Sequence, residues 1–159
     1  MDIEDVYHKY SKDVFRFCLS LCGSPAIADD MTSETFLKAI KSCEGFRGQC
    51  SVKAWLLIIA KNTYYDYLRK HKKFAALSDD IPCENEMERE FLDKDEAFRI
   101  DKLLRKLAEP YQEVFSLRVY AELPFADIGR MFAKSESWAR VTYHRARLKL
   151  KEDVFHEGM

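Results

Sequence analysis

The sequence predicts an all-α protein with two small helical domains joined by an acidic linker. Three observations support this prediction: apolar residues recur at three- and four-residue steps along most of the chain, no stretch alternates like a half-buried strand, and two basic ends flank an acidic middle. The 159 residues are enough for one domain or for two small ones with modest cores. With 33% charged and 47% hydrophobic residues, the composition gives no reason to expect disorder.

The N-terminal part of the chain predicts two helices with clear boundaries. Asp2 can cap the first helix, which ends at Gly23, and Ser24-Pro25 begins the second with a capping residue and a proline in the first turn. A loop containing Gly45 and Gly48 follows. The residues expected to face inward are Ile3, Val6, Tyr7, Tyr10, Val14, Phe17 and Leu21 in the first helix and Ala28, Thr32, Thr35, Phe36 and Ala39 in the second.

A third helix, capped by Ser51 and continuing to Lys73, changes character along its length. It starts with the apolar run AWLLIIA at residues 54–60, and residues 61–73 then hold three tyrosines and five lysines and arginines. We therefore expect its first half to be enclosed and its second half to emerge on a surface. On a helical wheel, one face holds Ala54, Leu57, Ile58, Tyr65 and Leu68, and the adjacent stripe holds Trp55, Asn62, Asp66, Arg69 and Lys73.

The exposed half of this helix has the composition of a surface for single-stranded nucleic acid. Its aromatic rings alternate with cations, and an unpaired nucleotide offers both a face to stack on and a phosphate to neutralise. Asp66 can pair with Arg69 and Lys70, three and four residues further on, which would fix the direction of those side chains. A buried helix with a solvated end remains the alternative for this segment taken alone.

Residues 76–95 are predicted to form the linker, because proline, turn-forming residues and acids interrupt the helical pattern. Residues 78–101 carry ten aspartates and glutamates against three basic residues. We expect this charge to hold the two basic lobes together in the free protein and to reduce their contact with phosphate. A second set of helices is predicted over residues 86–107, 110–121, 124–132 and 135 to about 155.

Residues 124–150 predict a helix-turn-helix, a short helix followed by a tight break and a longer basic helix. Small Gly129 permits close approach of the second helix. We expect Arg140 to read a guanine, and His144, Arg145 and Lys149 to contact the DNA backbone. The inner residues are Ile128, Gly129 and Phe132 in the first helix and Ala139, Tyr143, Ala146 and Leu150 in the second, and the basic row on the opposite face is Arg140, His144, Arg147 and Lys151.

Several other classes of protein are disfavoured. The acidic start does not resemble a signal peptide, and the longest apolar run is far too short to cross a bilayer. Five scattered cysteines favour free thiols in a reducing cytoplasm, and Cys18 and Cys22 are expected to be core residues rather than metal ligands. No nucleophile with a base and no metal-ligand spacing is present, so we expect no enzymatic activity, cofactor or metal.

Three segments together resemble the extracytoplasmic-function (ECF) sigma factors of bacterial RNA polymerase, over about residues 4–152. They are DDMTSETFLKAI, FRGQCSVKAWLLIIAKNTYYDYLRKHKK and the helix-turn-helix, in that order. The resemblance implies a domain at 1–75 that docks on core RNA polymerase and melts and reads the −10 element of the promoter as a single strand. It implies a second domain at 96–159 that reads the −35 duplex, and an anti-sigma factor as a further partner.

The resemblance also implies three sets of site residues. The loop at Gln49, Cys50 and Ser51 is similar to one that takes a flipped base. For Trp138, the residue and its place in the helix favour packing against the neighbouring helix over a contact with DNA. The implied contacts are Gln49, Cys50, Ser51, Lys61, Asn62, Tyr65, Asp66, Arg69 and Lys70 for the −10 strand; Ser135, Glu136, Ser137, Trp138, Arg140, Val141, His144 and Arg145 for the −35 duplex; and Asp29, Asp30, Ser33, Glu34, Leu37 and Lys38 for polymerase.

One alternative function stays open at this point. A stand-alone helix-turn-helix repressor that binds operator DNA as a dimer would have the same second domain. It would need no polymerase, so the mass of the protein on size exclusion with and without core polymerase would distinguish the two.

Overall fold

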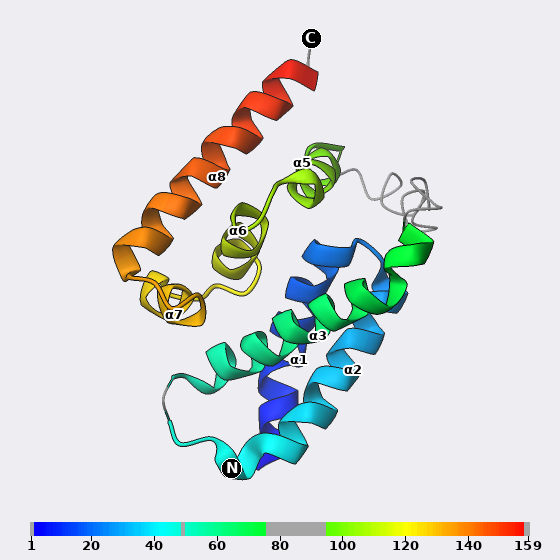
Figure 1. The fold of residues 1–159 in the computed structure, drawn as a ribbon, viewed down its shortest axis with the longest axis vertical. Helices are drawn as coiled ribbons and strands as arrows, with labels where there is room; N and C mark the ends of the chain where they lie inside the picture. The colour runs from blue at the N-terminus through cyan, green and yellow to red at the C-terminus, as the bar shows by residue number, and fades with distance from the viewer. Residues whose placement is uncertain (1, 49, 76–94, 158–159) are drawn as a thin grey trace.

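A computed structural model describes residues 2–48, 50–75 and 95–157, and every regular element in these ranges is helical (Figure 1). This confirms the all-α prediction. The elements are α1 (Ile3–Cys22), α2 (Pro25–Ser42), the 3₁₀ turn η1 (Cys43–Gly45), α3 (Val52–Ala75), α5 (Asp95–Lys106), α6 (Tyr111–Val119), α7 (Phe125–Met131) and α8 (Glu136–Glu157). The predicted linker lies outside the described residues apart from its last position, as do the first nine residues of the helix predicted from Glu86.

The boundaries of the first three helices follow from their capping residues, as predicted. The Asp2 carboxylate accepts a hydrogen bond from the Glu4 N–H at 3.0 Å, and the Ser24 hydroxyl accepts one from the Ile27 N–H at 3.3 Å. Gly23 ends α1 in the left-handed conformation, with φ +74°. The Ser51 hydroxyl caps α3 by accepting from the Ala54 N–H at 3.1 Å.

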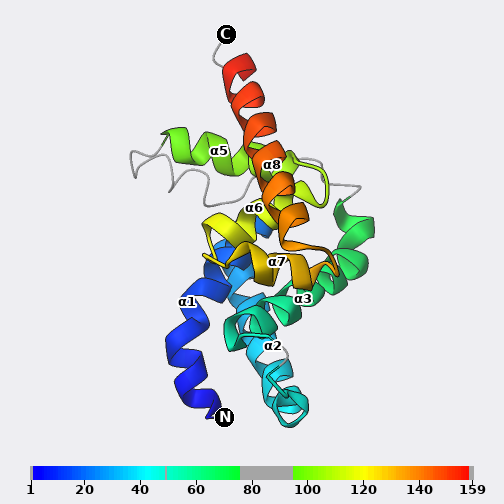
Figure 2. The same ribbon diagram turned by 90° about the vertical axis from the view of Figure 1, so that its left-hand side faces the viewer.

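Helices α1, α2 and α3 form the N-terminal lobe, where they pack around a shared apolar core (Figures 1 and 2). Val14 and Phe17 of α1, Ala28 and Ala39 of α2, and Leu57 of α3 are fully buried. Thr32 and Thr35 are also buried, and each hydroxyl donates to the backbone carbonyl four residues earlier, so neither is left without a partner.

The buried face of α3 differs from the one that the helical wheel predicted. Leu56, Ala60 and Tyr64 are buried, whereas Ile58 is only partly buried and Leu68 is 37% exposed. The Tyr64 hydroxyl donates to the Leu21 carbonyl at 3.2 Å, which turns this face toward the end of α1. Because the C-terminal lobe covers a second side of α3, its burial does not follow a single stripe.

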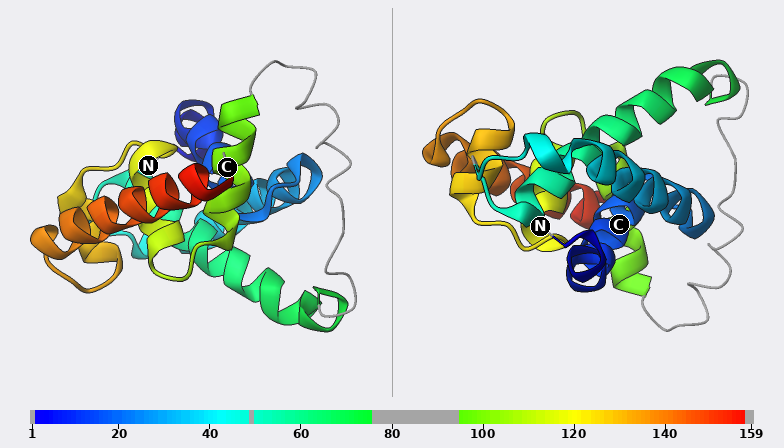
Figure 3. Two further views of the ribbon diagram at one scale, coloured as in Figure 1. Left: turned by 90° about the horizontal axis from the view of Figure 1, so that it is seen from above. Right: turned by 90° about the horizontal axis from the view of Figure 1, so that it is seen from below.

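Helices α5 to α8 form the C-terminal lobe. Leu103 and Leu104 of α5, Leu107 just after it and Phe115 of α6 pack with Ala146 and Leu150 of α8 in a separate apolar cluster. Seen from above, α8 lies over α5 and α6 (Figure 3). The start of α1 and the end of α8 lie at opposite ends of the molecule (Figure 2).

The two lobes are in direct contact. The larger core cluster continues from α1–α3 into Val114 and Leu117 of α6 and Ile128 of α7. In addition, the Arg105 guanidinium of α5 lies against Gly23, so close that a Cβ at this glycine would be 2.8 Å from it. A cation there is favourable, because the C-terminal end of α1 carries partial negative charge. The lobes therefore lie together, as expected, and these contacts join them. The acidic segment that was expected to hold the lobes together lies largely outside the described residues.

Candidate nucleic-acid interfaces

The turn of the helix-turn-helix depends on the absence of a side chain at Gly129. The Gly129 carbonyl accepts hydrogen bonds from the Phe132 and Lys134 N–H groups at 3.1 and 2.8 Å. A Cβ on Gly129 would lie 2.6 Å from the Ser135 carbonyl oxygen, which is closer than real Cβ atoms come. Gly129 therefore permits the close approach of the turn just before α8. The left-handed residue of this turn is Ala133, with φ +55°, which the sequence did not indicate.

Helix α8 presents one polar and one apolar side, as predicted. Ala139, Ala146 and Leu150 are buried against the rest of the lobe. The Ser135 hydroxyl caps the helix by accepting from the Trp138 N–H at 3.0 Å. Seven of the eight predicted −35 contacts are exposed at this end of α8: Ser135, Glu136, Ser137, Arg140, Val141, His144 and Arg145.

The eighth residue, Trp138, is partly buried. Its ring packs on the ring of Phe132, the residue that caps the C-terminal end of α7, with 5.3 Å between centroids. This confirms the expectation that Trp138 packs against the neighbouring helix. Arg140 pairs with Glu136 at 3.2 Å and lies 5.3 Å from the centroid of the Phe125 ring, so its guanidinium is directed before any DNA arrives. Val141 is 47% exposed and offers an apolar contact of the kind a thymine methyl group makes.

The C-terminal half of α3 emerges on the surface, as predicted. Asn62, Arg69 and Lys70 are exposed and Asp66 is partly so. Asp66 forms the predicted ion pair with Arg69. Among the described side chains its second cationic partner is Lys38 of α2, at 3.5 Å, and not Lys70.

Other predicted −10 contacts touch the C-terminal lobe, although Ser51 remains exposed. The Tyr65 hydroxyl donates to Oε1 of Glu113 in α6 at 2.8 Å, and Lys61 Nζ lies 3.9 Å from the centroid of the Phe132 ring. The Ser51 hydroxyl donates to Oδ2 of Asp127 in α7 at 3.4 Å. Cys50 is partly buried beside these residues, and Gln49 lies outside the described part of the chain. In this arrangement, α6 and α7 cover the N-terminal part of the predicted strand-binding surface.

Glu113 is the least solvated acid at this contact. It is 1% exposed, and its Oε2 atom has no hydrogen-bond partner among the described residues. Burial raises the pKa of Glu113, although the hydrogen bond from Tyr65 opposes the change. Burial also lowers the pKa of Lys61, because the charged ammonium loses water there. Sequence analysis missed Glu113 and Asp127, since each becomes an interface residue only through the other lobe.

The predicted polymerase-docking residues lie along the outer side of α2. Asp29, Asp30, Ser33, Glu34 and Leu37 are exposed, whereas Lys38 is partly buried toward α3. Leu37 is 58% exposed and Ile40, one turn further on, is 51% exposed. Sequence analysis did not select Ile40. A pair of exposed apolar residues next to carboxylates on one helix is suited to a protein partner.

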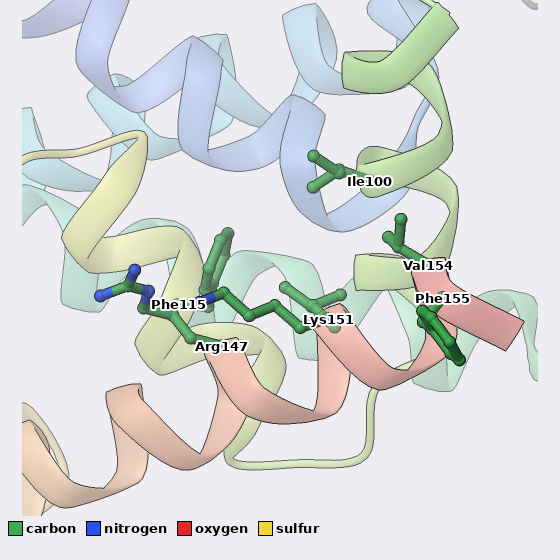
Figure 4. Close-up of a pocket in the computed structure, with 7 residues that line it drawn as sticks. Ile100, Phe115, Arg147, Lys151, Val154 and Phe155 are labelled. Carbon is green, nitrogen blue, oxygen red and sulfur yellow. The ribbon is translucent and has the colours of Figure 1, made fainter. Parts of the chain in front are cut away.

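An apolar groove of about 440 Å³ runs between α5, α6 and α8 (Figure 4). Arg147 and Lys151 stand on its α8 side, and Phe155, 66% exposed, lies at its far end. The remaining lining residues are Ile100, Phe115, Leu150 and Val154. The sequence did not indicate this groove, because its walls come from three helices that only the tertiary structure brings together.

Cys18 has the properties of a packing residue. Cys18 is fully buried, and burial raises the pKa of its thiol to about 12, so it stays protonated. Within the described ranges, no group of three histidines, cysteines or acids is placed to hold a metal ion. No described helix is both long and apolar enough to span a membrane.

Comparison with known proteins adds two kinds of finding. The family model "Sigma-70 region 2" matches residues 6–74, and the model "Sigma-70, region 4" matches residues 97–150. The chain is 30% identical to the ECF RNA polymerase sigma factor SigM of Bacillus subtilis, over all of this chain and 98% of that protein. It is also 30% identical to the RNA polymerase sigma factor YlaC of the same organism, over 96% and 91% of the two chains.

Solved structures that share the fold include two complexes. The sigma factor RpoE of Bartonella quintana, in complex with the anti-sigma factor NepR, superposes with a TM-score of 0.74 at 20% identity, covering 94% of each chain. CnrH, in complex with the cytosolic domain of CnrY, superposes with a TM-score of 0.73 at 21% identity, covering 97% of this chain and 88% of CnrH.

Proposed function

The chain belongs to the ECF sigma factors, and we propose that it binds core RNA polymerase and directs promoter recognition, strand opening and the initiation of transcription. The observation that carries this proposal is the presence of two different exposed surfaces on one chain. One is a helix-turn-helix and the other is a helix that emerges with aromatic and basic side chains, and both lie within the matched family regions. In this proposal the protein has no enzymatic activity of its own, and it acts in the cytoplasm together with RNA polymerase.

We assign recognition of the −35 duplex to the N-terminal turns of α8. The exposed Ser135 to Ser137 segment carries free backbone N–H groups, which favour phosphate, and Arg140 and Val141 point outward from the next turn. Arg140 offers a bidentate donor for guanine, and Val141 an apolar surface for a thymine methyl group. His144 and Arg145 follow on the same exposed side and supply backbone contacts.

We assign the −10 strand to the surface of α3 and the loop before it. The exposed residues Asn62, Arg69 and Lys70 form the accessible part of this surface, and Lys61 and Tyr65 form the part that the C-terminal lobe covers. Ser51 is exposed at the edge of the covered part, where it donates to Asp127. The covered residues become available when the lobes separate. We therefore infer that the closed arrangement belongs to the free protein and that promoter binding requires an open one.

Docking on core polymerase is assigned to the outer side of α2. Leu37 and Ile40 supply apolar area, and Asp29, Asp30 and Glu34 supply charge for a basic partner surface. Ser33 lies among them on the exposed side. An anti-sigma factor is a further expected partner, because two of the solved structures with this fold, RpoE and CnrH, are complexes with an anti-sigma factor and with the cytosolic domain of CnrY.

The experiment that tests this function separates a sigma factor from a repressor. Purified protein is run on size exclusion alone and with core polymerase, and the pooled complex is then assayed for transcription from a promoter that core alone does not use. We expect a monomer that joins core and activates transcription. A dimer that ignores core and binds promoter DNA unaided would support the repressor instead.

A matched substitution tests the docking surface within the same assay. Replacing Asp30 and Glu34 with Asn and Gln should reduce competition for core polymerase, because both carboxylates are exposed on α2. The control replaces Glu152 with Gln, which is equally exposed but lies on α8. Unchanged capture of core by the α2 variant would count against this docking surface.

A further inference from the structure

One lysine joins the surface assigned to polymerase with the surface assigned to DNA. Lys38 of α2 lies with Nζ 3.6 Å from Glu34 on its own helix and 3.5 Å from Asp66 on α3. The same Nζ donates to the Thr63 hydroxyl at 3.1 Å. Helices α2 and α3 lie side by side (Figure 1), so this lysine of α2 reaches the Thr63 and Asp66 side chains of α3.

Asp66 is in turn held between two cations. It accepts from the Arg69 guanidinium and pairs with Lys38, and the hydrogen bond from Arg69 is the main reason that its pKa is lowered. Charges therefore alternate along the row Glu34, Lys38, Asp66 and Arg69. The Arg69 side chain is 76% exposed, so it lies at the outer end of this row, where a phosphate can reach it.

A carboxylate in this position does not suit contact with DNA. Asp66 would repel a phosphate, and it competes with phosphate for the same arginine. The strength of that competition depends on how much negative charge remains on Asp66 once Arg69 leaves. Lys38 compensates this charge, because it stays beside Asp66 when Arg69 turns outward.

We propose that Lys38 and Asp66 are positioning residues for strand opening: Lys38 acts as the counter-ion that lets Asp66 release Arg69 to the phosphate of the −10 strand. This inference rests on the proposed function, since it presumes that Arg69 contacts the promoter. It assigns Lys38 to the opening step instead of the docking surface. It also removes Asp66 from the residues that touch DNA.

The test compares Lys38→Met, Asp66→Asn, the double variant and Arg69→Ala as complexes with core polymerase. Methionine keeps an unbranched apolar stem but removes the ammonium group. Lys41→Met is the control, because Lys41 is an exposed lysine on the same helix. Affinity for core polymerase is measured by competition. Strand opening is measured at saturating core polymerase, as the rate at which −10 thymines become reactive to permanganate.

We expect Lys38→Met to slow opening about two- to fivefold, the range expected for one partly exposed ion pair, with affinity for core unchanged. Asp66→Asn should open at least as fast as the parent, and the double variant should return to the rate of Asp66→Asn. That rescue is the readout that a merely structural role would not produce.

Other outcomes overturn the inference in distinguishable ways. If Asp66→Asn opens as slowly as Arg69→Ala, Asp66 contacts the strand itself. Reduced affinity for core in Lys38→Met, with normal opening once core is saturated, would make Lys38 a docking residue. A double variant as slow as Lys38→Met would leave only a structural role. If Arg69→Ala opens at the parental rate, the proposed strand-opening surface fails as well.

Discussion

Arg140 lies one turn into α8, exposed and held by Glu136, in the position from which a side chain enters the major groove. We predict that Arg140→Ala weakens binding of the holoenzyme to promoter DNA by about 1–3 kcal/mol, the usual cost of one base contact. Affinity for core polymerase should not change, because α8 is in the other lobe from the docking surface. A gel-shift titration of parent and variant holoenzyme measures the difference.

The control for Arg140 is a promoter with a scrambled −35 element. On that DNA the parent and the variant should bind alike, since the specific contact is already absent. Equal affinity of the two proteins for the intact promoter would remove Arg140 from the recognition surface.

At the scale of single residues, local chemistry was predictable and long-range partners were not. Asp2, Ser24 and Ser51 were recognised as caps, because a cap depends only on the residues beside it in sequence. Glu113 could not be recognised in the same way. Its partner Tyr65 is 48 positions away in the chain, so nothing beside Glu113 marks it as an interface residue.

Gly129 controls how α7 meets α8. We predict that Gly129→Ala destabilises the protein by about 1–3 kcal/mol, the usual cost of forcing a methyl group into a packed site. The group it would meet is the Ser135 carbonyl, which belongs to the backbone and cannot simply rotate away. Urea unfolding followed by circular dichroism gives the free energy, and binding to the −35 element should weaken as the turn shifts.

Gly45→Ala provides the matched control. Its Cβ would meet nothing within 4 Å, so this variant should unfold like the parent. If both glycine variants lose the same stability, the effect at Gly129 is not a consequence of the tight turn.

At the scale of elements, the sequence predicted which segments are helical more accurately than which faces they bury. Helices α1, α7 and α8 begin and end within a residue or two of the predicted positions, and α2 begins at the predicted Pro25, because caps, prolines and periodicity are local signals. The buried face of α3 was wrong in detail. Helices α1 and α2 cover α3 from one side and the C-terminal lobe covers it from another, whereas the helical wheel assumes a single buried face.

At the scale of the molecule, closure of the lobes should depend on pH through Glu113. Its pKa is raised in the closed form because the carboxyl group is buried, and separation of the lobes returns it to water. The closed form therefore binds a proton more strongly. The stabilisation of the closed form by protonated Glu113 is fully present below the ordinary pKa of glutamate. It is lost as the pH rises through the raised pKa that Glu113 has in the closed form. Among the neighbours of Glu113, burial raises the pKa of Tyr65 and lowers the pKa of Lys61.

We predict that the free protein becomes more compact in small-angle X-ray scattering as the pH falls from about 8 to about 5, a range in which most proteins remain folded. Glu113→Gln, which imitates the protonated carboxyl group, should stay compact throughout. Glu152→Gln, exposed on α8, should respond like the parent. An unchanged pH response in Glu113→Gln would assign the effect to other groups.

The acidic linker remains a prediction at this scale. Its charge was expected to bring the lobes together, and in the described part of the chain the lobes meet through apolar packing, hydrogen bonds, Lys61 over the Phe132 ring and Arg105 against Gly23. A charge map gives the sign of a long-range attraction, but it does not identify the surfaces that finally touch. Those surfaces depend on shape complementarity, which only the folded lobes have.

The central claim is that the exposed half of α3 opens the −10 strand, and replacing Asn62 and Arg69 together tests it most directly. Both side chains are exposed, so the variant should fold, bind core polymerase and bind the −35 element like the parent. The measurement is the rate at which −10 thymines become reactive to permanganate, on duplex promoter and on a promoter with a preformed bubble. We predict slow opening on the duplex and recovery on the bubble. Opening of the duplex at the parental rate would contradict the account.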